Sequence, residues 1–268
     1  MPRFSANLSM LFGEVDFLSR FQAAAKAGFS GVEYLFPYDY HKQQLAELLD
    51  KHHLVQVLHN LPAGNWAAGE RGIACLPDRV GEFQDGVGEA IAYAKVLGCS
   101  QLNVLAGIRP PRVEADVVQE TLYNNLRFAA KAMKAEGIKL LVEAINTFDI
   151  PGFVITRTPQ VLALIRDIGS DNLFVQYDIY HMQRMEGELG LTLQSQLQHI
   201  AHIQLADNPG RHEPGTGEIN YPFLFGLLDR LGYQGWVGCE YKPKGGTVAG
   251  LGWVGLASIC KSYRRRPK

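Results

Sequence analysis

Short apolar runs alternate with longer segments of helical periodicity along the whole chain. The first run, residues 4–8, precedes a segment at 14–27 whose apolar side chains recur every three or four positions, and Gly28 follows as a C-cap. Further strands are predicted at residues 31–35, 55–59 and 102–105, and four more end at Glu143, Asp178, Gln204 and Glu240. Further helices are predicted at residues 41–52, 80–97, 113–136, 159–167 (with Thr158 as N-cap), 193–198, 222–231 and 251–263.

Eight strands that alternate with helices predict parallel strands joined by right-handed crossovers. The chain has 268 residues, which is about the size of a single (β/α)₈ barrel. The glycine-rich fingerprint of dinucleotide-binding folds does not follow the first strand, and this disfavours an open doubly wound sheet. We therefore expect one α/β domain, a (β/α)₈ TIM barrel over residues 1–263, with a basic, frayed tail at 264–268.

Composition and charge narrow the possible partners. Hydrophobic residues make up 47% of the chain and charged residues 20%, and the formal net charge is -1. This balance supports a large core and gives no general attraction to nucleic acid or to anionic membranes. Four scattered cysteines, together with the lack of a signal-like or membrane-spanning apolar run, favour a cytoplasmic protein with reduced thiols. The sequence leaves open whether the chain forms a homo-oligomer.

Polar side chains end four successive strands of the expected barrel. Glu143, Asp178, Gln204 and Glu240 lie about one strand–helix unit apart, and active sites of such barrels lie at the C-terminal ends of the strands. Three carboxylates in one polar cup repel each other unless a cation neutralises them. Each of these residues alone could be a capping or paired polar group. The register of all four predicts a metal site, and its oxygen ligands suit Mg²⁺ or Mn²⁺ better than Zn²⁺.

Other residues near the strand ends are candidates for binding substrate. His59 ends the third strand and His181 follows Asp178 by three residues, so both could donate hydrogen bonds or move protons. Arg211, in a glycine- and proline-rich loop after the seventh strand, could hold a carboxylate. His202 should point to the same side of its strand as Gln204, and we assign it to the surroundings of the site or to the core.

Two connections have the composition of shaped loops. The segment at residues 60–78 contains several glycines and prolines and is long for a compact domain. We expect it to act as a lid and to contact substrate, although an ordered surface loop packed on Trp66 would give the same pattern. The loop at residues 207–218 has a similar composition and should border the active end of the barrel.

Several segments of the sequence resemble the hydroxypyruvate isomerase family of the xylose-isomerase-like barrel superfamily. These segments are residues 4–9, 58–64, 66–72, 178–183, 213–219 and 238–241. The resemblance covers nearly the whole chain and implies an aldose–ketose type isomerase of a small hydroxy-oxo acid, in carbohydrate acid metabolism. The family reaction converts hydroxypyruvate to tartronate semialdehyde, and a bacterial branch acts on 2-oxo-tetronates.

Related ketose 3-epimerases carry a metal on Glu, Asp, His and Glu. Glu143, Asp178 and Glu240 match that pattern, whereas Gln204 stands where the epimerases have His. The resemblance also places His181 and Arg211 near positions that contact substrate oxygens. Asp149 falls where the epimerases have another substrate-contacting acid.

The resemblance implies a mechanism through a cis-enediolate, with the metal making the neighbouring C–H more acidic. Glu143 and Glu240 would remove and return the proton, while Arg211 or His59 would hold the substrate carboxylate. The main alternative is a ketose 3-epimerase that uses the same carboxylates on a longer sugar. An endonuclease of the same barrel class would need a His-rich zinc site and a basic face, and a non-catalytic sensor of sugar acids would bind without turnover.

Overall fold

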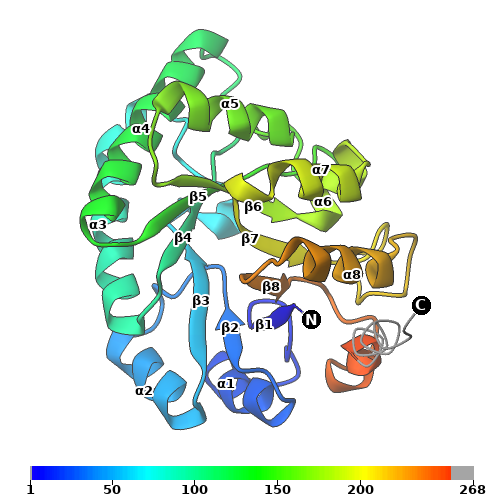
Figure 1. The fold of residues 1–268 in the computed structure, drawn as a ribbon. Helices are drawn as coiled ribbons and strands as arrows, with labels where there is room; N and C mark the ends of the chain where they lie inside the picture. The colour runs from blue at the N-terminus through cyan, green and yellow to red at the C-terminus, as the bar shows by residue number, and fades with distance from the viewer. Residues whose placement is uncertain (1, 255–268) are drawn as a thin grey trace.

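The strands pair in chain order, and the first also pairs with the last, so the sheet closes into a barrel. This computed structural model describes residues 2–254. All pairs are parallel, as β1 with β2 and β8 show, and helices surround the strands (Figure 1). The strands are β1 Arg3–Asn7, β2 Gly31–Glu33, β3 Val55–Asn60, β4 Gln101–Val104, β5 Lys139–Glu143, β6 Leu173–Asp178, β7 Ile200–Leu205 and β8 Trp236–Cys239. The predicted (β/α)₈ barrel is confirmed.

The connecting helices return the chain from the end of each strand to the start of the next. They are α1 Phe17–Lys26, α2 Lys42–His52, α3 Val80–Leu97, α4 Ala115–Ala135, α5 Thr158–Ile168, α6 Ile179–Met185, α7 Leu189–Gln196 and α8 Tyr221–Leu231. Short 3₁₀ turns lie at Trp66–Ala68, Pro77–Arg79, Leu197–His199 and Val248–Gly252. Within residues 2–254, none of the helices combines the length and the apolar character that crossing a membrane requires.

The apolar core has two parts. The larger part joins the outer faces of the strands to the buried faces of the helices; α4, for example, buries a stripe of residues at helical spacing. The smaller part comes from strands alone and contains Val57, Leu58, Leu141, Phe174, Ala201 and Trp236. Leu141, Phe174, Ala201 and Trp236 precede the polar residues on β5, β6, β7 and β8, so this part of the barrel interior is apolar near the strand starts and polar near the strand ends.

Several element boundaries differ from the prediction. Arg157, and not Thr158, is the N-cap of α5, because Thr158 is already helical and the Arg157 N–H donates to Gln160 Oε1 at 3.0 Å. Helix α7 begins earlier than the predicted 193–198 segment, and α6 was missed because it starts directly after Asp178 without a break. Most of the helix predicted at 251–263, and the tail at 264–268, lie outside the described residues.

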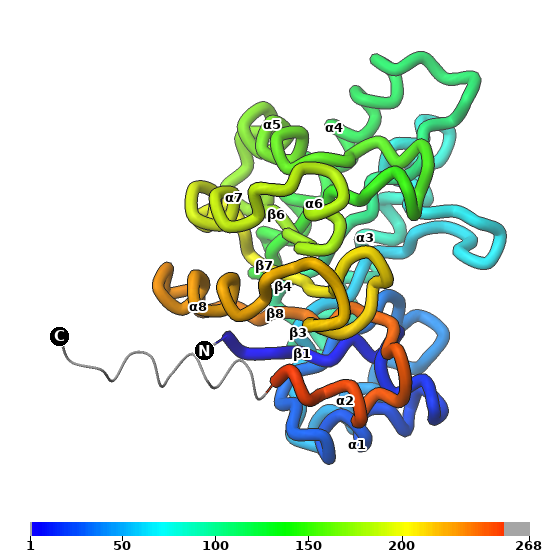
Figure 2. Tube along the Cα trace, turned by 90° about the vertical axis from the view of Figure 1, so that its right-hand side faces the viewer, coloured from blue at the N-terminus to red at the C-terminus, as the bar shows by residue number. Residues whose placement is uncertain are grey.

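Closure of the barrel brings chain segments that are far apart in sequence into contact. In the turned view, β1 lies beside β8 at the start of the chain (Figure 2), and the register pairs Ser5 with Gly238. Cys75, Cys99 and Cys239 are free and buried, as expected for reduced thiols, while Cys260 lies outside the described residues. The closed sheet directs polar residues from β1 and β2 towards those of β7 and β8.

Candidate active site

The C-terminal ends of β5 to β8 bring the predicted polar residues together. Glu143 ends β5, Asp178 ends β6, Gln204 is the last residue but one of β7, and Glu240 follows β8 directly. Asp178 pairs with Gln204, which in turn pairs with Gly238. All four side chains are buried, and alternation along each strand directs them into the barrel.

Glu143 and Asp178 face His181, which lies on α6. The three residues each offer one ligand atom within 4.8 Å of the others, and His181 Nε2 lies 3.7 Å from Glu143 Oε1 and 3.6 Å from Asp178 Oδ2. The other oxygen of Asp178 accepts from Tyr180 N at 2.8 Å and so caps α6. Among the described residues, Glu143 Oε1 and Asp178 Oδ2 are buried without a hydrogen-bond partner. Buried carboxylate oxygens of this kind are costly, and they fit a cation.

Burial and mutual repulsion raise the pKa values of the three carboxyl groups. The pKa of Glu143 lies well above its usual range because of burial and because Glu240 and Asp178 are close. Burial raises the pKa of Asp178 to about 6 and that of Glu240 to about 8, although Arg211 acts in the opposite direction on both. The cluster therefore holds protons near neutral pH unless another cation replaces them.

His181 is a neutral hydrogen-bond donor. Asn146 Oδ1 accepts from the backbone N–H groups of Phe148 and Asp149, so Asn146 Nδ2 is the group 2.6 Å from His181 Nδ1. His181 Nδ1 therefore accepts, and we assign the proton to Nε2, which faces the carboxylates. Burial, with the nearby Arg211, holds the pKa of His181 well below its usual value. Asn146 was missed from the sequence because an asparagine in a connecting loop gives no distinctive signal.

Arg211 supplies the positive charge at this end of the barrel. Its Nη2 lies 2.8 Å from Glu240 Oε2 and 3.8 Å from Asp178 Oδ2, and its Nη1 lies 3.8 Å from Asp149 Oδ2. The backbone of Arg211 has a φ of 54°, a conformation that a non-glycine residue adopts at a cost. Its loop is held by Asp207, whose carboxylate accepts from four backbone N–H groups, those of Asn208, Gly215, Gly217 and Ile219.

Gln204 lies at the floor of the site. Its Nε2 donates to Glu33 Oε1 at 2.8 Å, and its Oε1 accepts from Gln176 Nε2 at 2.6 Å. The side chain is therefore held in one orientation, with the oxygen directed away from Glu33. Glu33 is a buried acid that the sequence analysis missed, although it lies two residues after Gly31 on a predicted strand.

His59 does not join the carboxylate group. Its Nδ1 lies 3.1 Å from Asn60 O, its ring lies beside Tyr38, and burial lowers its pKa to about 4. The next residue, Asn60, takes the inward position instead, because Asn103 Nδ2 donates to Asn60 Oδ1 at 3.1 Å and to Glu143 Oε2 at 3.3 Å. A register shift between β2 and β3 sets which residues of β3 point inward, and the sequence pattern gives no sign of it.

Aromatic and charged side chains of the loop at residues 60–78 pack on each other and on residues outside the loop. Trp66 contacts Phe36 with ring centroids 5.1 Å apart, and the Arg71 guanidinium lies 4.1 Å from the centre of the Trp66 ring. Glu70 pairs with Arg79 at 2.6 Å. The role of this loop as a lid stays a prediction.

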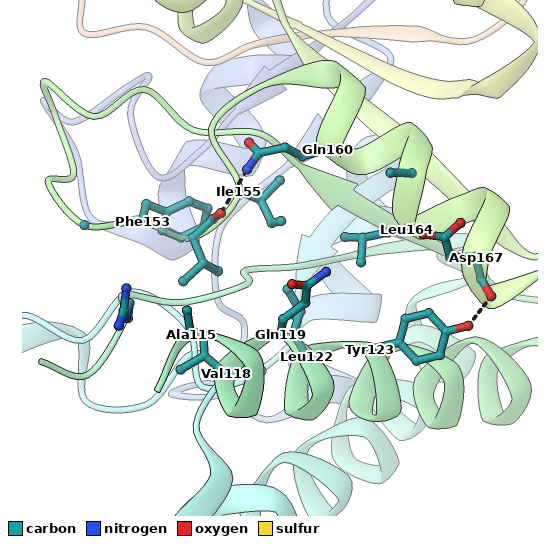
Figure 3. A pocket seen from close by; sticks show the side chains of 14 residues that line it. Ala115, Val118, Gln119, Leu122, Tyr123, Phe153, Ile155, Gln160, Leu164 and Asp167 are labelled. Carbon is teal, nitrogen blue, oxygen red and sulfur yellow. Dashed lines mark hydrogen bonds between the residues drawn. The ribbon is translucent and has the colours of Figure 1, made fainter. Parts of the chain in front are cut away.

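A separate hollow lies on the outside of the barrel between α4 and α5. Figure 3 shows its wall, with Val118 and Leu122 from α4 facing Phe153, Ile155 and Leu164. The cavity measures about 440 Å³. The carboxylates at the strand ends do not line it, so this cavity is separate from the candidate active site.

Comparisons with known proteins agree with the fold. A model of the family described as "Xylose isomerase-like TIM barrel" matches residues 21–255. The chain is 58% identical to hydroxypyruvate isomerase of Escherichia coli (strain K12) and 48% identical to 2-oxo-tetronate isomerase of Cupriavidus necator; each match covers 95% of this chain and 98% of the relative. A crystal structure titled AP endonuclease, family 2, from Brucella melitensis superposes with a TM-score of 0.93 at 46% identity, covering 95% of this chain and 98% of the other. The chain therefore belongs to the hydroxypyruvate isomerase family of xylose isomerase-like TIM barrels, and it is an isomerase.

Proposed function

We propose that the chain interconverts the aldose and ketose forms of a small hydroxy-oxo acid. The substrate would be hydroxypyruvate, giving tartronate semialdehyde, or the analogous 2-oxo-tetronate. Hydroxypyruvate and 2-oxo-tetronate appear in the names of two similar proteins. One observation carries the proposal: Glu143, Asp178 and Glu240 are buried together with one arginine and one neutral histidine. This arrangement combines groups that can exchange protons with groups that can hold an anionic substrate.

The oxygen atoms of the site fit a divalent cation. We propose that Glu143, Asp178, Gln204 and Glu240 hold Mg²⁺ or Mn²⁺, since oxygen ligands suit these ions and two of the carboxylate oxygens are buried without hydrogen-bond partners in the described structure. When bound, the cation would make the C–H beside the substrate carbonyl more acidic by stabilising the negative charge that develops.

Glu143 and Glu240 are the proposed proton carriers. Their raised pKa values bring both groups closer to working pH, where a group can both accept and donate a proton. Among the described residues, one side chain donates to Glu143, Asn103 to Oε2, so Glu143 is less engaged than Glu240. Both oxygens of Glu240 already accept, from Asn7 and from Arg211. We therefore assign the first proton abstraction to Glu143 and the return of a proton to the neighbouring carbon to Glu240.

Arg211 and His181 would orient the substrate. The Arg211 guanidinium offers donors in a planar fork that matches a carboxylate, and it lies between Glu240 and Asp149. His181 would donate from Nε2 to a substrate oxygen and would stabilise negative charge on that oxygen as the enediolate forms. His59 is directed towards Tyr38, and for this reason we propose Arg211 as the group that holds the carboxylate.

A ketose 3-epimerase is the alternative reaction for the same carboxylates. Asp149 falls where the resemblance places another substrate-contacting acid of the epimerases. Here Asp149 Oδ1 lies 3.2 Å from Arg184 Nη1, and its Oδ2 accepts from Tyr180 Oη at 2.9 Å. Because Arg184 and Tyr180 engage both oxygens of Asp149, this carboxylate is less available to accept hydrogen bonds from a neutral sugar. This supports an acid substrate.

The proposal is tested by a substrate panel. Hydroxypyruvate, 2-oxo-tetronate and a neutral ketose should be assayed side by side with Mg²⁺ or Mn²⁺ and again after chelation. We expect turnover of at least one of the two acids, little turnover of the ketose, and loss of activity after chelation that added metal restores. Preferred turnover of the ketose would support the epimerase, and binding of the acids without turnover or solvent proton exchange would support a sensor.

A further inference from the structure

A buried acid lies directly beneath the proposed metal ligands. Glu33, the last residue of β2, is fully buried in the barrel interior. Four side chains from two other strands donate to its carboxylate: Ser5 Oγ at 2.7 Å, Asn7 Nδ2 at 3.4 Å, His202 Nε2 at 2.9 Å and Gln204 Nε2 at 2.8 Å. A buried carboxylate with this many donors is held firmly in place.

The chain makes room for this acid. A Cβ atom at Gly238 would lie 2.3 Å from Glu33 Oε1 and 2.4 Å from Oε2, so only glycine leaves the carboxylate in its position. The donors from Ser5, His202 and Gln204 offset the burial of the carboxylate.

The first connection from Glu33 runs to Gln204. The amide nitrogen of Gln204 donates to Glu33, so the amide oxygen faces away from Glu33 and accepts from Gln176. An amide can bind a cation only through its oxygen. The contact with Glu33 therefore selects the orientation of Gln204 in which metal binding is feasible.

The second connection runs through Asn7 to Glu240. Asn7 Oδ1 accepts from Ser9 N at 3.1 Å, which leaves Nδ2 as the group directed into the barrel. That nitrogen lies 3.4 Å from Glu33 Oε1 and 3.1 Å from Glu240 Oε1. Asn7 thus links the buried acid to a second proposed ligand.

We propose that Glu33 is a positioning residue for the metal site, which orients Gln204 directly and Glu240 through Asn7. This inference rests on the proposed function, because it assumes that Gln204 and Glu240 bind a cation. Residues that hold the ligands of a metal typically change its affinity by about 10- to 100-fold when they are replaced. Glu33 does not touch the substrate or the metal itself and acts through the residues that do.

The test measures Mn²⁺ affinity by titration calorimetry on three single variants, with the melting temperature of each metal-free protein recorded in parallel. Glu33→Gln keeps the volume of the side chain but removes its charge, and Asn7→Ala removes the link between Glu33 and Glu240 but leaves the contact of Glu33 with Gln204. Ser5→Ala is the matched control, because Ser5 is buried on the same strand as Asn7 and donates to Glu33 but contacts neither ligand.

We expect Glu33→Gln to weaken Mn²⁺ binding by about 10- to 100-fold and Asn7→Ala by about tenfold. The Mn²⁺ affinity of Ser5→Ala should stay within about twofold of wild type, even if its melting temperature falls as far as that of Asn7→Ala. If Glu33→Gln does not fold, the Mn²⁺ affinity of Asn7→Ala is compared with that of Ser5→Ala. This comparison tests the connection to Glu240 through Asn7. The inference is overturned if wild type binds Mn²⁺ and the folded variants bind it equally well. If wild type itself does not bind Mn²⁺ or Mg²⁺, the proposed metal site is wrong, and the inference is overturned with it.

Discussion

The raised pKa values of the carboxylate cluster predict that metal binding depends steeply on pH between 6 and 8. Burial brings the pKa of Glu240 to about 8 and that of Asp178 to about 6. A raised pKa means that the folded protein holds protons that the unfolded chain has lost. The metal-free cluster therefore loses stability as pH rises from about 4 towards 8, and the affinity for a cation grows in the same window.

The size of the effect follows from the pKa of Glu240. At pH 6 its carboxyl group is two units below a pKa of about 8, so releasing that proton costs about 3 kcal/mol, or about 100-fold in affinity. Titration calorimetry with Mn²⁺ at pH 6, 7 and 8 measures this change. Repeating the titration at pH 7 in two buffers of different ionisation enthalpy counts the protons released, and we expect at least about one per metal ion, since the pKa values of both Glu240 and Glu143 are raised.

Glu240→Gln is the control for this prediction. It should bind Mn²⁺ more weakly than wild type at pH 8 and show a smaller dependence between pH 6 and 8, because Glu240 no longer titrates while Asp178 and Glu143 still do. Ordinary carboxylates have pKa values near 4 and would give a nearly constant affinity over this range. A change of less than about threefold in the wild type between pH 6 and 8 would therefore refute the reasoning.

Three further substitutions give separate expectations. Arg211→Gln should raise KM for the acid substrate by about 10- to 100-fold, since a charge-assisted contact contributes about 1.5–3 kcal/mol, and steady-state kinetics would show it; an unchanged KM would exclude Arg211 as the carboxylate contact. Gly238→Ala should weaken Mn²⁺ binding because the added Cβ would lie 2.3 Å from Glu33, and calorimetry equal to wild type would contradict this. His181→Asn should lower kcat by about 100-fold, as loss of one donor to a developing oxyanion does, whereas a purely structural histidine would lower the melting temperature and leave kcat unchanged.

The barrel and the ends of four strands could be predicted from the sequence because both depend on local patterns. Alternation of apolar runs and amphipathic helices specifies parallel strands, and the first polar residue after a buried run marks a strand end. Glu143 and Asp178 end their strands as predicted. The end of β8 was displaced by one residue, which leaves Glu240 just beyond the strand.

The residues that hold the site could not be found in this way, because their roles depend on contacts between distant strands. Asn7 and Glu240 are 233 positions apart and meet only when the sheet closes. The inward position of Asn60 beside the predicted His59 could not be read from the sequence, since a register shift between neighbouring strands changes which residues face inward. Glu33 was missed because one acid on a short strand gives no pattern, although its four donors make it part of the site.

The central claim is that the buried glutamates transfer the proton during isomerisation. The most direct measurement is the turnover of hydroxypyruvate by Glu240→Gln in D₂O, with deuterium incorporation followed by NMR and folding checked by circular dichroism. The account predicts a correctly folded variant whose turnover and exchange fall by at least about 100-fold, the contribution of a positioned acid–base group. Turnover and deuterium exchange equal to wild type in that folded variant would contradict it.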